Sequence, residues 1–353
     1  MDVLFITRKW PPAVGGMETY CVELCARLER ETNLRVEALP GRPDGSTPSA
    51  ASLIGFGLRM VWRLLVSPGR FEAAHGSDMA VWPLVWLAGV RKPGARLVLS
   101  AHGTDVSLGT RRGVVARLYA GYLRIGARLL ARATVLANSQ ASAGLARRFG
   151  FSDVRVVRLG ATPSAGSADL SEPYVLFVGR LKASKGCGWF VREVLPKLPP
   201  EVRLKVAGTV IHAAEREALD HPRVDYLGPK FGEELAALRR NALAVIVPNL
   251  TGGPETFEGF GLAATEAAAA GAVVVAARAH GIADAVIDGV TGFLETPGDA
   301  GAWAARIAMI AAWTPGERAS FVERARAAVA AEYSWDRVAR ETLDAYAARG
   351  SEG

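Results

Sequence analysis

The fold of this 353-residue sequence is decided by the stretch Glu258-Gly259-Phe260-Gly261-Leu262-Ala263-Ala264-Thr265-Glu266. Its glycines lead into an alanine-rich helical segment, and the apolar strand Ala272–Ala276 follows that helix. A loop, a helix and a buried strand in this order are typical of a parallel α/β sheet, which holds ligands beyond the carboxyl ends of its strands. A carboxylate beside a helix start can accept hydrogen bonds from hydroxyl groups. The stretch therefore predicts a binding site in which Glu258 and Glu266 face one ligand.

Strand patterns alternate with helical patterns twice along the chain, which predicts two doubly wound parallel sheets. The first set of expected strands is Val3–Ile6, Leu34–Leu39, Ala73–His75, Arg96–Ala101, Thr134–Ala137 and Val154–Arg158. The second set is Tyr174–Val178, Arg203–Val206, Val224–Leu227, Ala244–Val247 and Val273–Ala276, with helices that include Trp189–Leu198 and Glu233–Asn241. Between the sets, Gly160–Ser167 has the composition of a linker. We expect an N-terminal domain over 1–160, a second domain over 170–332, and ligands in a cleft between them.

Composition limits the class of protein. A chain with 50% hydrophobic and 22% charged residues is long enough for two well-packed domains. Three cysteines, Cys21, Cys25 and Cys187, cannot form a disulfide framework, so we expect a cytoplasmic protein. There is no signal-peptide pattern, and the apolar stretches Leu53–Val66 and Met79–Val90 are too short to span a bilayer.

The positive charge is concentrated in the first half of the chain. Residues 1–165 hold 22 Lys and Arg against 11 Asp and Glu, whereas the remainder holds 20 against 24. Leu53–Val66 and Arg111–Arg132 both mix arginines with apolar and aromatic residues, as helices at an anionic membrane surface do. Ordinary helices flanking a sheet, with a solvated basic surface, are the alternative. No nucleic-acid-binding motif is present, so we expect no nucleic acid as a partner.

Three further motifs follow expected strands. Gly15 and Gly16 open a helix after the first strand without the GxGxxG spacing of a dinucleotide site, and helix N-terminal amides there could meet a phosphate. His102 and Asp105, in Ser100–Asp105, are expected to project toward the cleft. Alternatively His102 is a satisfied loop histidine and Asp105 caps the next turn.

Arg180 and Lys185 follow the first strand of the second half, in Gly179–Gly186. A planar guanidinium and a point-charge ammonium five residues apart can bracket a diphosphate. They would also stabilise a leaving group that gains negative charge. A solvated basic loop is the alternative interpretation.

These motifs in this order resemble the retaining glycosyltransferases of family four, also called group one, and the resemblance covers nearly the whole chain. It implies the GT-B fold, in which two Rossmann-like domains face one another. It further implies that the helix after Tyr333-Ser334-Trp335, at about residues 335–348, crosses back to the first domain.

The resemblance assigns a role to each matching residue. Arg180 and Lys185 would bind the donor diphosphate, Glu266 the nucleotide ribose, and Glu258 the donor sugar. The amides of Phe260, Gly261 and Leu262 would contact sugar hydroxyls and phosphate, His102 would lie against the donor sugar, and the loop at Gly15 and Gly16 would approach the phosphate.

The sequence departs from the family pattern in three places. Leu159-Gly160-Ala161-Thr162 replaces the usual Asn-Gly-Val-Asp, and Gly208-Thr209-Val210 replaces Gly-x-Gly. The segment before Glu258 is also unusual, so Glu255 is an alternative for the carboxylate that faces the sugar. These departures affect two expected features, the hinge between the domains and the contacts to the nucleotide base.

The implied activity is transfer of a hexose-type sugar from a UDP- or GDP-linked donor to a hydroxyl of a sugar or lipid-linked acceptor, with retention of configuration. Polysaccharide, lipopolysaccharide or glycolipid assembly would use such an enzyme, and an anionic surface on the inner face of the membrane is a candidate partner. We expect no cofactor and no metal, because the chain contains no Asp-x-Asp. The alternatives are a sugar-nucleotide epimerase, a phosphorylase, or a non-catalytic sugar- or lipid-binding scaffold.

Overall fold

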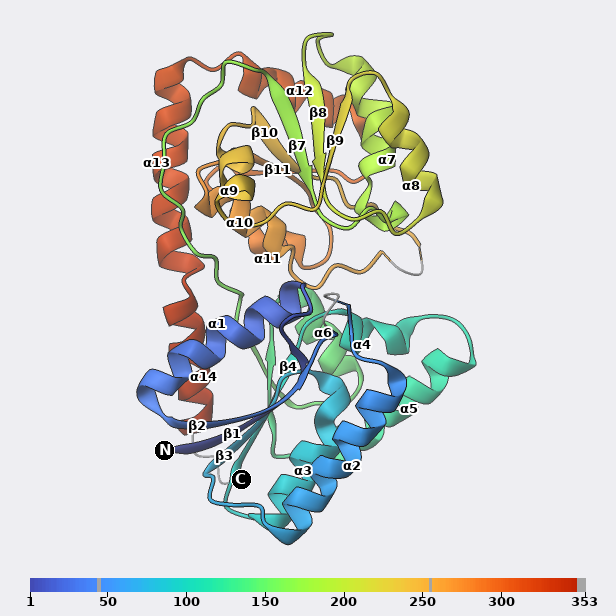
Figure 1. Ribbon diagram of the computed structural model, residues 1–353, viewed down its shortest axis with the longest axis vertical. Helices are drawn as coiled ribbons and strands as arrows, with labels where there is room; N and C mark the ends of the chain where they lie inside the picture. The colour runs from blue at the N-terminus through green and yellow to red at the C-terminus, as the bar shows by residue number, and fades with distance from the viewer. Residues whose placement is uncertain (43–45, 254–255, 348–353) are drawn as a thin grey trace. The chain divides into compact units, whose positions relative to one another are not determined.

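The computed structural model describes residues 1–42, 46–253 and 256–347, and the chain divides into two compact units (Figure 1). Unit 1 comprises Met1–Leu159 together with the segment that begins at Trp335, and unit 2 comprises Gly160–Ser334. The backbone therefore passes between the units twice. Glu255, the alternative sugar-facing carboxylate, lies outside the described residues.

Unit 1 contains a sheet of six parallel strands in the order β2-β1-β3-β4-β5-β6. The strands are β1 (Asp2–Trp10), β2 (Asn33–Pro40), β3 (Ala73–Gly76), β4 (Arg96–Ala101), β5 (Thr134–Ala137) and β6 (Asp153–Val156). Its centre is formed by side chains such as Phe5, Val98 and Val135, all without exposed surface. Continuous apolar runs are what a parallel sheet covered on both faces requires.

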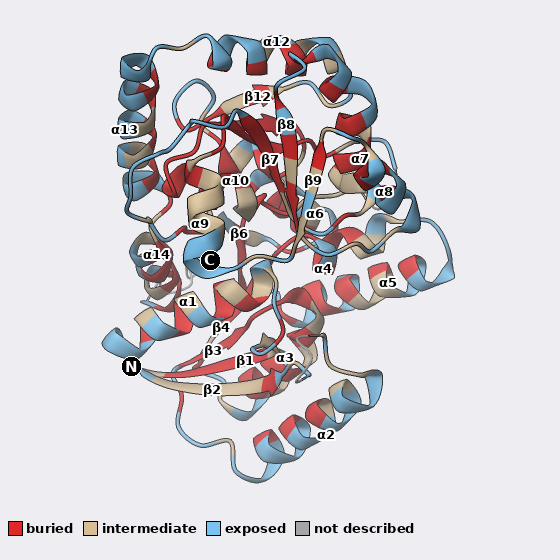
Figure 2. Cartoon of the chain, turned by 45° about the horizontal axis from the view of Figure 1, so that its top comes forward, coloured by how far each residue is buried: buried red, intermediate tan, exposed pale blue. Residues whose placement is uncertain are grey.

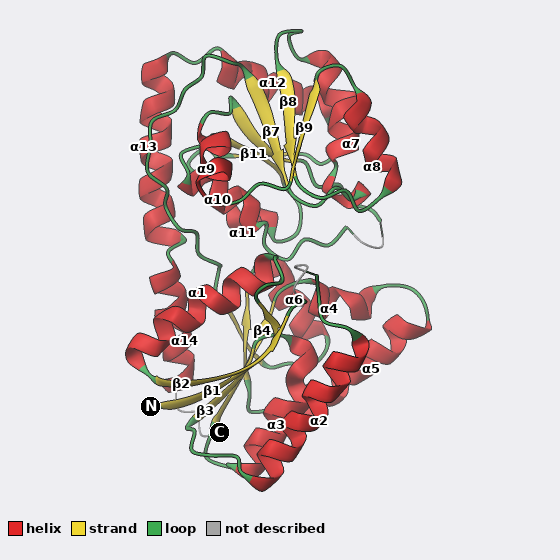
Figure 3. Ribbon diagram, in the orientation of Figure 1, coloured by secondary structure: helices red, strands yellow, loops and turns green. Residues whose placement is uncertain are grey.

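The helices of unit 1 connect these strands (Figure 3). They are α1 (Gly16–Glu31), α2 (Ala50–Val66), α3 (Trp82–Arg91), α4 (Thr104–Ser107), α5 (Val114–Leu129), α6 (Gln140–Arg148) and α14 (Trp335–Ala347). The last of these packs on α1, where Arg27 donates to Asp336 over 2.8 Å. The hydroxyl of Tyr346 lies 2.6 Å from Nδ1 of His75 in the sheet. The final described helix thus packs as part of unit 1.

Unit 2 contains a second sheet of six parallel strands in the order β12-β11-β10-β7-β8-β9. The strands are β7 (Tyr174–Val178), β8 (Arg203–Ala207), β9 (Val224–Gly228), β10 (Ala244–Val247), β11 (Val274–Ala277) and β12 (Phe293–Glu295). The helices are α7 (Cys187–Trp189), α8 (Ala213–Glu217), α9 (Gly232–Arg240), α10 (Leu262–Ala269), α11 (Ile282–Ala285), α12 (Ala300–Ala311) and α13 (Pro315–Glu332). The prediction of two parallel α/β sheets is confirmed.

Two details of unit 2 differ from the sequence prediction. Strand β12 is absent from the expected set, because three residues at a sheet edge carry too short an apolar pattern. The expected helix Trp189–Leu198 is irregular: after α7 come a π-helical turn, Phe190–Val194, and a 3-10 turn, Leu195–Lys197. Pro196, which has no N–H to donate, lies in that last turn and prevents a regular α-helix from continuing.

Each sheet has one point at which the strand order changes direction. It lies between β1 and β3 in unit 1 and between β7 and β10 in unit 2. Open parallel sheets bind their ligands beyond the carboxyl ends of the strands at such a point. The loops that follow these four strands are therefore the places where functional side chains are expected.

Candidate active site

The loops after β7 and β10 bring Lys185 and Glu258 into contact at the switch point of unit 2. The Lys185 ammonium donates to Oε2 of Glu258, and Asn249 donates to the same oxygen from 3.2 Å. About a quarter of each charged side chain is exposed, so the ion pair is partly open to solvent. Arg180, from the same loop as Lys185, is exposed near them. The structure thus brings together three of the residues that the sequence predicts for one site.

Backbone constraints hold these two loops together. Leu250 N–H donates to the Ser184 carbonyl over 3.1 Å. Gly186 has a φ of 75°, and a Cβ built there would lie 2.0 Å from the Pro248 carbonyl oxygen. Only glycine fits such a close approach in a left-handed conformation. Lys185 is therefore held next to the β10 loop by the packing of the main chain.

Glu258 is held as a carboxylate. Burial opposes its ionisation, but the Lys185 charge, the hydrogen bonds from Lys185 and Asn249, and the Arg180 charge outweigh burial and leave its pKa below the usual range. At neutral pH Glu258 is an anion that accepts hydrogen bonds. It is not suited to act as a general acid.

The N-terminus of α10 adds unpaired backbone donors beside Glu258. Gly261 caps this helix with a φ of 90°, and in the described part of the chain no hydrogen bond involves the amides of Phe260, Gly261 or Leu262. The loop is fixed by Gly281 N–H, which donates to the Glu258 carbonyl over 3.0 Å. These amides and the helix dipole form a location that favours negative charge.

Glu266 lies on α10 and forms an ion pair that the sequence does not predict. Arg239 of α9 donates to its Oε2, and the Arg239 side chain is 11% exposed. Among the described residues, Oε1 of Glu266 has no hydrogen-bond partner. The arginine therefore orients the carboxylate and leaves one oxygen for a ligand hydroxyl.

Two other residues beside Glu258 were not identified from the sequence. Asn249 is 3% exposed, and its Oδ1 has no hydrogen-bond partner in the described residues. His280 follows β11 and has a φ of 45°. Its ring centre lies 5.0 Å from that of Phe257, and its buried Nδ1 has no hydrogen-bond partner among the described residues. Strained backbone and orphaned polar atoms are typical of functional sites. The sequence signal was their position directly after two neighbouring strands, Asn249 after β10 and His280 after β11.

In unit 1, the Asp105 carboxylate is turned into its own loop, which corrects the sequence prediction for that side chain. Asp105 is buried and accepts from the amides of His102, Gly103 and Met79 over 2.8–3.2 Å. His102 is 9% exposed, and its Nε2 lies 2.9 Å from the Ser77 carbonyl. The carboxylate satisfies loop amides that would otherwise be buried without partners.

The protonation state of His102 follows from these contacts. Burial lowers its pKa, although the Asp105 and Asp78 carboxylates oppose that effect. A carbonyl can only accept, so the ring proton is on Nε2, and Nδ1 is the acceptor. His102 is therefore a neutral imidazole that can accept one hydrogen bond.

The Gly15 and Gly16 turn lies at the start of α1, where a carboxylate is already present. Gly15 caps α1, and a Cβ built on it would lie 2.6 Å from Oε2 of Glu18. Glu18 is 7% exposed, and its Oε1 lies 3.6 Å from Lys9 Nζ. An anion that reached this helix terminus would meet Glu18 as well as the amides.

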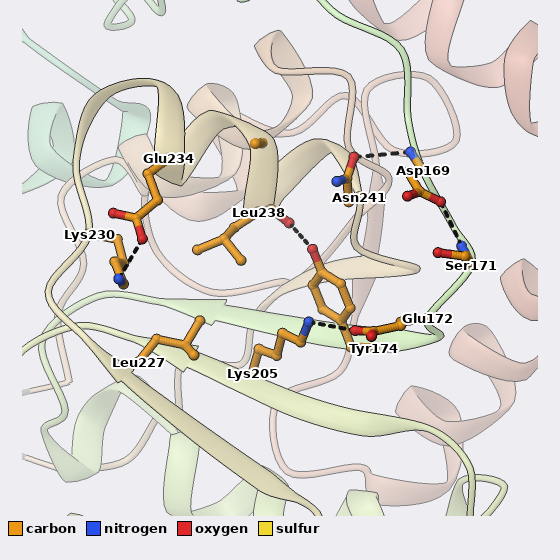
Figure 4. Close-up of a pocket in the computed structure, with 11 residues that line it drawn as sticks. Asp169, Ser171, Glu172, Tyr174, Lys205, Leu227, Lys230, Glu234, Leu238 and Asn241 are labelled. Carbon is orange, nitrogen blue, oxygen red and sulfur yellow. Dashed lines mark hydrogen bonds and ion pairs between the residues drawn. The ribbon is translucent and has the colours of Figure 1, made fainter.

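A separate pocket of about 500 Å³ lies between α9 and strands β7 and β8 of unit 2 (Figure 4). Four of its charged groups form two ion pairs: Lys205 contacts Glu172 over 3.1 Å, and Lys230 contacts Glu234 over 2.5 Å. The Asp169 carboxylate accepts from the Ser171 amide over 3.0 Å. Tyr174 donates to the Leu238 carbonyl over 2.8 Å. This pocket shares no residue with the Lys185 and Glu258 cluster, and its paired charges leave little to attract a charged ligand.

No group of three or more His, Cys, Asp or Glu side chains among the described residues is arranged as a metal-ligand set. No helix in the same part of the chain combines the length and apolarity needed to cross a membrane.

Comparison with protein families matches both halves of the chain. Residues 14–164 match the model for glycosyltransferase family 4, and residues 172–312 match the model for group 1 glycosyl transferases. The chain belongs to the group 1 glycosyltransferases of family 4. The family inferred from the order of its motifs is thereby confirmed.

The curated relatives include D-inositol 3-phosphate glycosyltransferases of Mycobacterium bovis and Mycobacterium tuberculosis, which are 34% identical over 208 residues. That match covers 55% of this chain and 42% of the relative. The chain therefore spans less than half the length of the curated relatives it matches.

Among solved structures, sucrose-phosphate synthase of Thermosynechococcus elongatus has a TM-score of 0.75 at 21% identity. HepE of Anabaena, solved with UDP and glucose, has a TM-score of 0.72 at 20% identity. Both alignments cover 98% of each chain. These likenesses show that the fold is GT-B.

Proposed function

We propose that this protein transfers a hexose-type sugar from a UDP- or GDP-linked donor to a hydroxyl of a sugar or lipid-linked acceptor, with retention of configuration. The observation that carries the proposal is the cluster of Lys185, Arg180 and Glu258 beside the free amides at the start of α10. Such a cluster offers both cations for a diphosphate and a carboxylate for sugar hydroxyls within one edge of one sheet.

The cations and amides would act on the leaving nucleotide diphosphate. Negative charge builds up on its phosphate oxygen as the bond to the sugar breaks. Lys185, which Glu258 holds, and the amides of Gly261 and Leu262 are in place before the donor arrives, so they stabilise that charge with little reorganisation, and the exposed Arg180 adds to it. They thereby supply the counter-charge that a metal supplies in other transferases.

Glu258 would act on the sugar as a permanent anion. In the absence of a donor its charge is balanced by Lys185 and Asn249. When the diphosphate takes up Lys185, sugar hydroxyls can replace that hydrogen bond. In each state Lys185 has an anionic partner and the Glu258 carboxylate has hydrogen-bond donors, so neither charged group is left without a partner.

Glu266 and His102 complete the proposed donor contacts. Glu266, oriented by Arg239, accepts from a ribose hydroxyl through Oε1. His102 accepts from a sugar hydroxyl through Nδ1, since Nε2 is engaged with Ser77. In the retaining reaction the acceptor attacks from the face that the diphosphate leaves, and the departing phosphate takes the acceptor proton.

Donor binding is tested by thermal unfolding with UDP, GDP, ADP and their sugars. A nucleotide that occupies the site at about 100 times its dissociation constant should stabilise the protein by about 2.7 kcal/mol. We expect one base to give this shift and Glu266→Ala to weaken it, because the ribose contact is lost. Glu234→Ala, which removes an exposed carboxylate from α9, serves as the matched control. A panel without any shift would contradict the proposed donor site.

Chelation tests the proposed source of the counter-charge. We expect EDTA to leave the transfer rate essentially unchanged, because protein cations and amides are proposed to stabilise the leaving group. The measurement is nucleotide release in EDTA, compared with the same assay in Mg²⁺ or Mn²⁺. Loss of activity that either metal restores would overturn this part of the proposal.

A further inference from the structure

Helix α2 uses only a narrow stripe of its apolar residues in the core of unit 1. Phe56, Met60 and Leu64, spaced by four residues, are at most 4% exposed. Large apolar side chains cover much of the remaining surface, and those with more than a third of their area exposed are Ile54, Leu58, Val61, Trp62, Leu65 and Val66. Trp62 is 68% exposed and Leu58 is 67% exposed. The core of unit 1 therefore does not account for the composition of α2.

Helix α5 shows the same excess. Its buried stripe is made mostly of small residues, such as Ala116, Ala120 and Gly126. The large apolar side chains point outward instead, and the exposed ones are Val114, Val115, Leu118, Ile125 and Leu129. An ordinary helix that flanks a sheet places its large apolar residues inward. Apart from the buried Leu123, helix α5 thus buries small apolar residues and exposes large ones.

The two helices share a neighbour in unit 1. Helix α3 packs against both α2 and α5, and its own Trp86 and Val90 are exposed. Figure 2 shows broad exposed bands along α2 and α5. We call this surface, formed by α2, α3 and α5, the α2–α3–α5 face. Exposed apolar areas of this kind are uncommon on a protein surface that contacts only water.

The α2–α3–α5 face is also strongly basic. The sequences of all three helices contain no Asp or Glu. Exposed arginines lie in the helices or directly beside them, and those with no carboxylate partner among the described residues are Arg59, Arg91, Arg112, Arg117, Arg124 and Arg128. Arg63 is the exception, since it pairs with Glu37 over 2.9 Å. The face thus offers positive charge and apolar side chains together.

We propose that the α2–α3–α5 face binds the surface of a lipid bilayer that contains anionic headgroups. Such a surface presents negative charge directly above an apolar layer, so it matches arginines interspersed with Trp, Leu and Val. A second copy of the chain fits less well, because its arginines would meet the same arginines. The argument for membrane binding does not depend on the sugar-transfer function. Together, the two proposals place the transfer reaction at a membrane surface.

Co-sedimentation with vesicles tests the proposal without any sugar donor. We expect the protein to sediment with phosphatidylcholine vesicles that contain phosphatidylglycerol, and to stay in the supernatant with phosphatidylcholine alone. Raised salt should weaken the binding, since it screens the arginines. The variant Leu58→Gln with Trp62→Gln, and the variant Arg112→Gln with Arg117→Gln, should each lower the vesicle affinity on the order of tenfold or more.

Matched controls come from surfaces elsewhere. Phe231→Gln removes an apolar side chain that is 60% exposed in unit 2, and Arg30→Gln removes an exposed charge on α1. Both should bind vesicles as the unmodified protein does. Circular dichroism and melting temperature would show that every variant is folded, because only exposed side chains are changed.

Three outcomes would overturn the proposal. One is equal recovery in the supernatant with and without anionic lipid at low salt. Another is unchanged binding by both face variants. The third is a dimer, seen by analytical ultracentrifugation, that the face variants dissociate while vesicles are not bound. That third result would assign the face to self-association and leave the proposed transfer reaction untouched.

Discussion

Replacing Lys185 with alanine is expected to lower turnover on the order of 10²-fold or more, because the ammonium lies where charge develops on the leaving diphosphate. The effect should appear in kcat as well as in kcat/KM, since the interaction strengthens as the bond to the sugar breaks. Arg180→Ala should act in the same direction. Initial rates of nucleotide release over a range of donor concentrations measure both quantities.

Lys182→Ala provides the matched control for Lys185→Ala. Lys182 lies in the same loop and carries the same charge, but among the described residues it forms no ion pair with Glu258. Its replacement should leave turnover within a few-fold of the original. Lys185→Gln separates charge from shape, because it can still donate a hydrogen bond to Glu258. Turnover near the unmodified value in both Lys185→Ala and Arg180→Ala would show that the diphosphate is bound elsewhere.

The strands were predictable because their signal is local. Arg96–Ala101, Thr134–Ala137, Tyr174–Val178 and Ala244–Val247 are found with the predicted bounds. Each of these strands consists mostly of apolar residues, which is the pattern of a strand covered on both faces. Strand β12 has three residues at an edge, so its pairing with β11 depends on tertiary contact more than on its own sequence. The local sequence pattern therefore predicts the longer strands but not the short strand at the edge of the second sheet.

The residues of the candidate site were predictable in kind but not in their pairing. The sequence indicates that Glu258 and Glu266 lie near a helix start, yet it does not show that Lys185 contacts the first and Arg239 the second. Lys185 and Glu258 are 73 residues apart, and their contact exists because β7 and β10 are neighbours in the sheet. Strand order is a property of the whole fold. Pairings that depend on it cannot be obtained from the motifs alone.

The loop that contains His102 and Asp105 illustrates the opposite error. A histidine after a strand is expected at the edge of the sheet, and that position is correct. The predicted orientation of Asp105 was wrong, because the buried amides of the same loop need an acceptor, and the Ser77 carbonyl needs the donor that His102 supplies. Asp105 and His102 satisfy these groups. Local hydrogen-bond demand thus turned the Asp105 carboxylate inward and engaged one ring nitrogen of His102.

Unit 1 is expected to lose stability as the pH falls from 6.5 toward 4.5, and His75 is a main cause. Burial lowers the pKa of His75 to about 3, and the nearby His102 adds to this effect. Its side chain has no exposed surface, and its ring nitrogens contact Tyr346 Oη over 2.6 Å and Ser100 Oγ over 2.8 Å. Among the described residues no carboxylate contacts the ring to compensate a positive charge.

The sign follows from proton binding. In the unfolded chain a histidine binds a proton below about pH 6.5, whereas folded His75 stays neutral until about pH 3. Between these values the unfolded state binds more protons, so acid favours unfolding. Each pH unit well inside that window costs about 1.4 kcal/mol, and because the unfolded histidine is only half protonated at pH 6.5 the loss between pH 6.5 and pH 4.5 is about 2 kcal/mol. Below the folded pKa this contribution stops growing.

The contribution of His75 is isolated by comparison with His75→Gln, which retains hydrogen-bonding groups but does not titrate. Hydrogen exchange of the β3 and β4 amides reports the stability of unit 1 separately from unit 2. The variant should be less stable than the unmodified protein at pH 7, because glutamine fits the ring's site poorly, but its stability should fall less steeply below pH 6.5. His221→Gln, in a loop of unit 2, should leave the slope in unit 1 unchanged. If His75→Gln and the unmodified protein lose stability in parallel, the acid sensitivity comes from other groups and His75 is not held neutral by its burial.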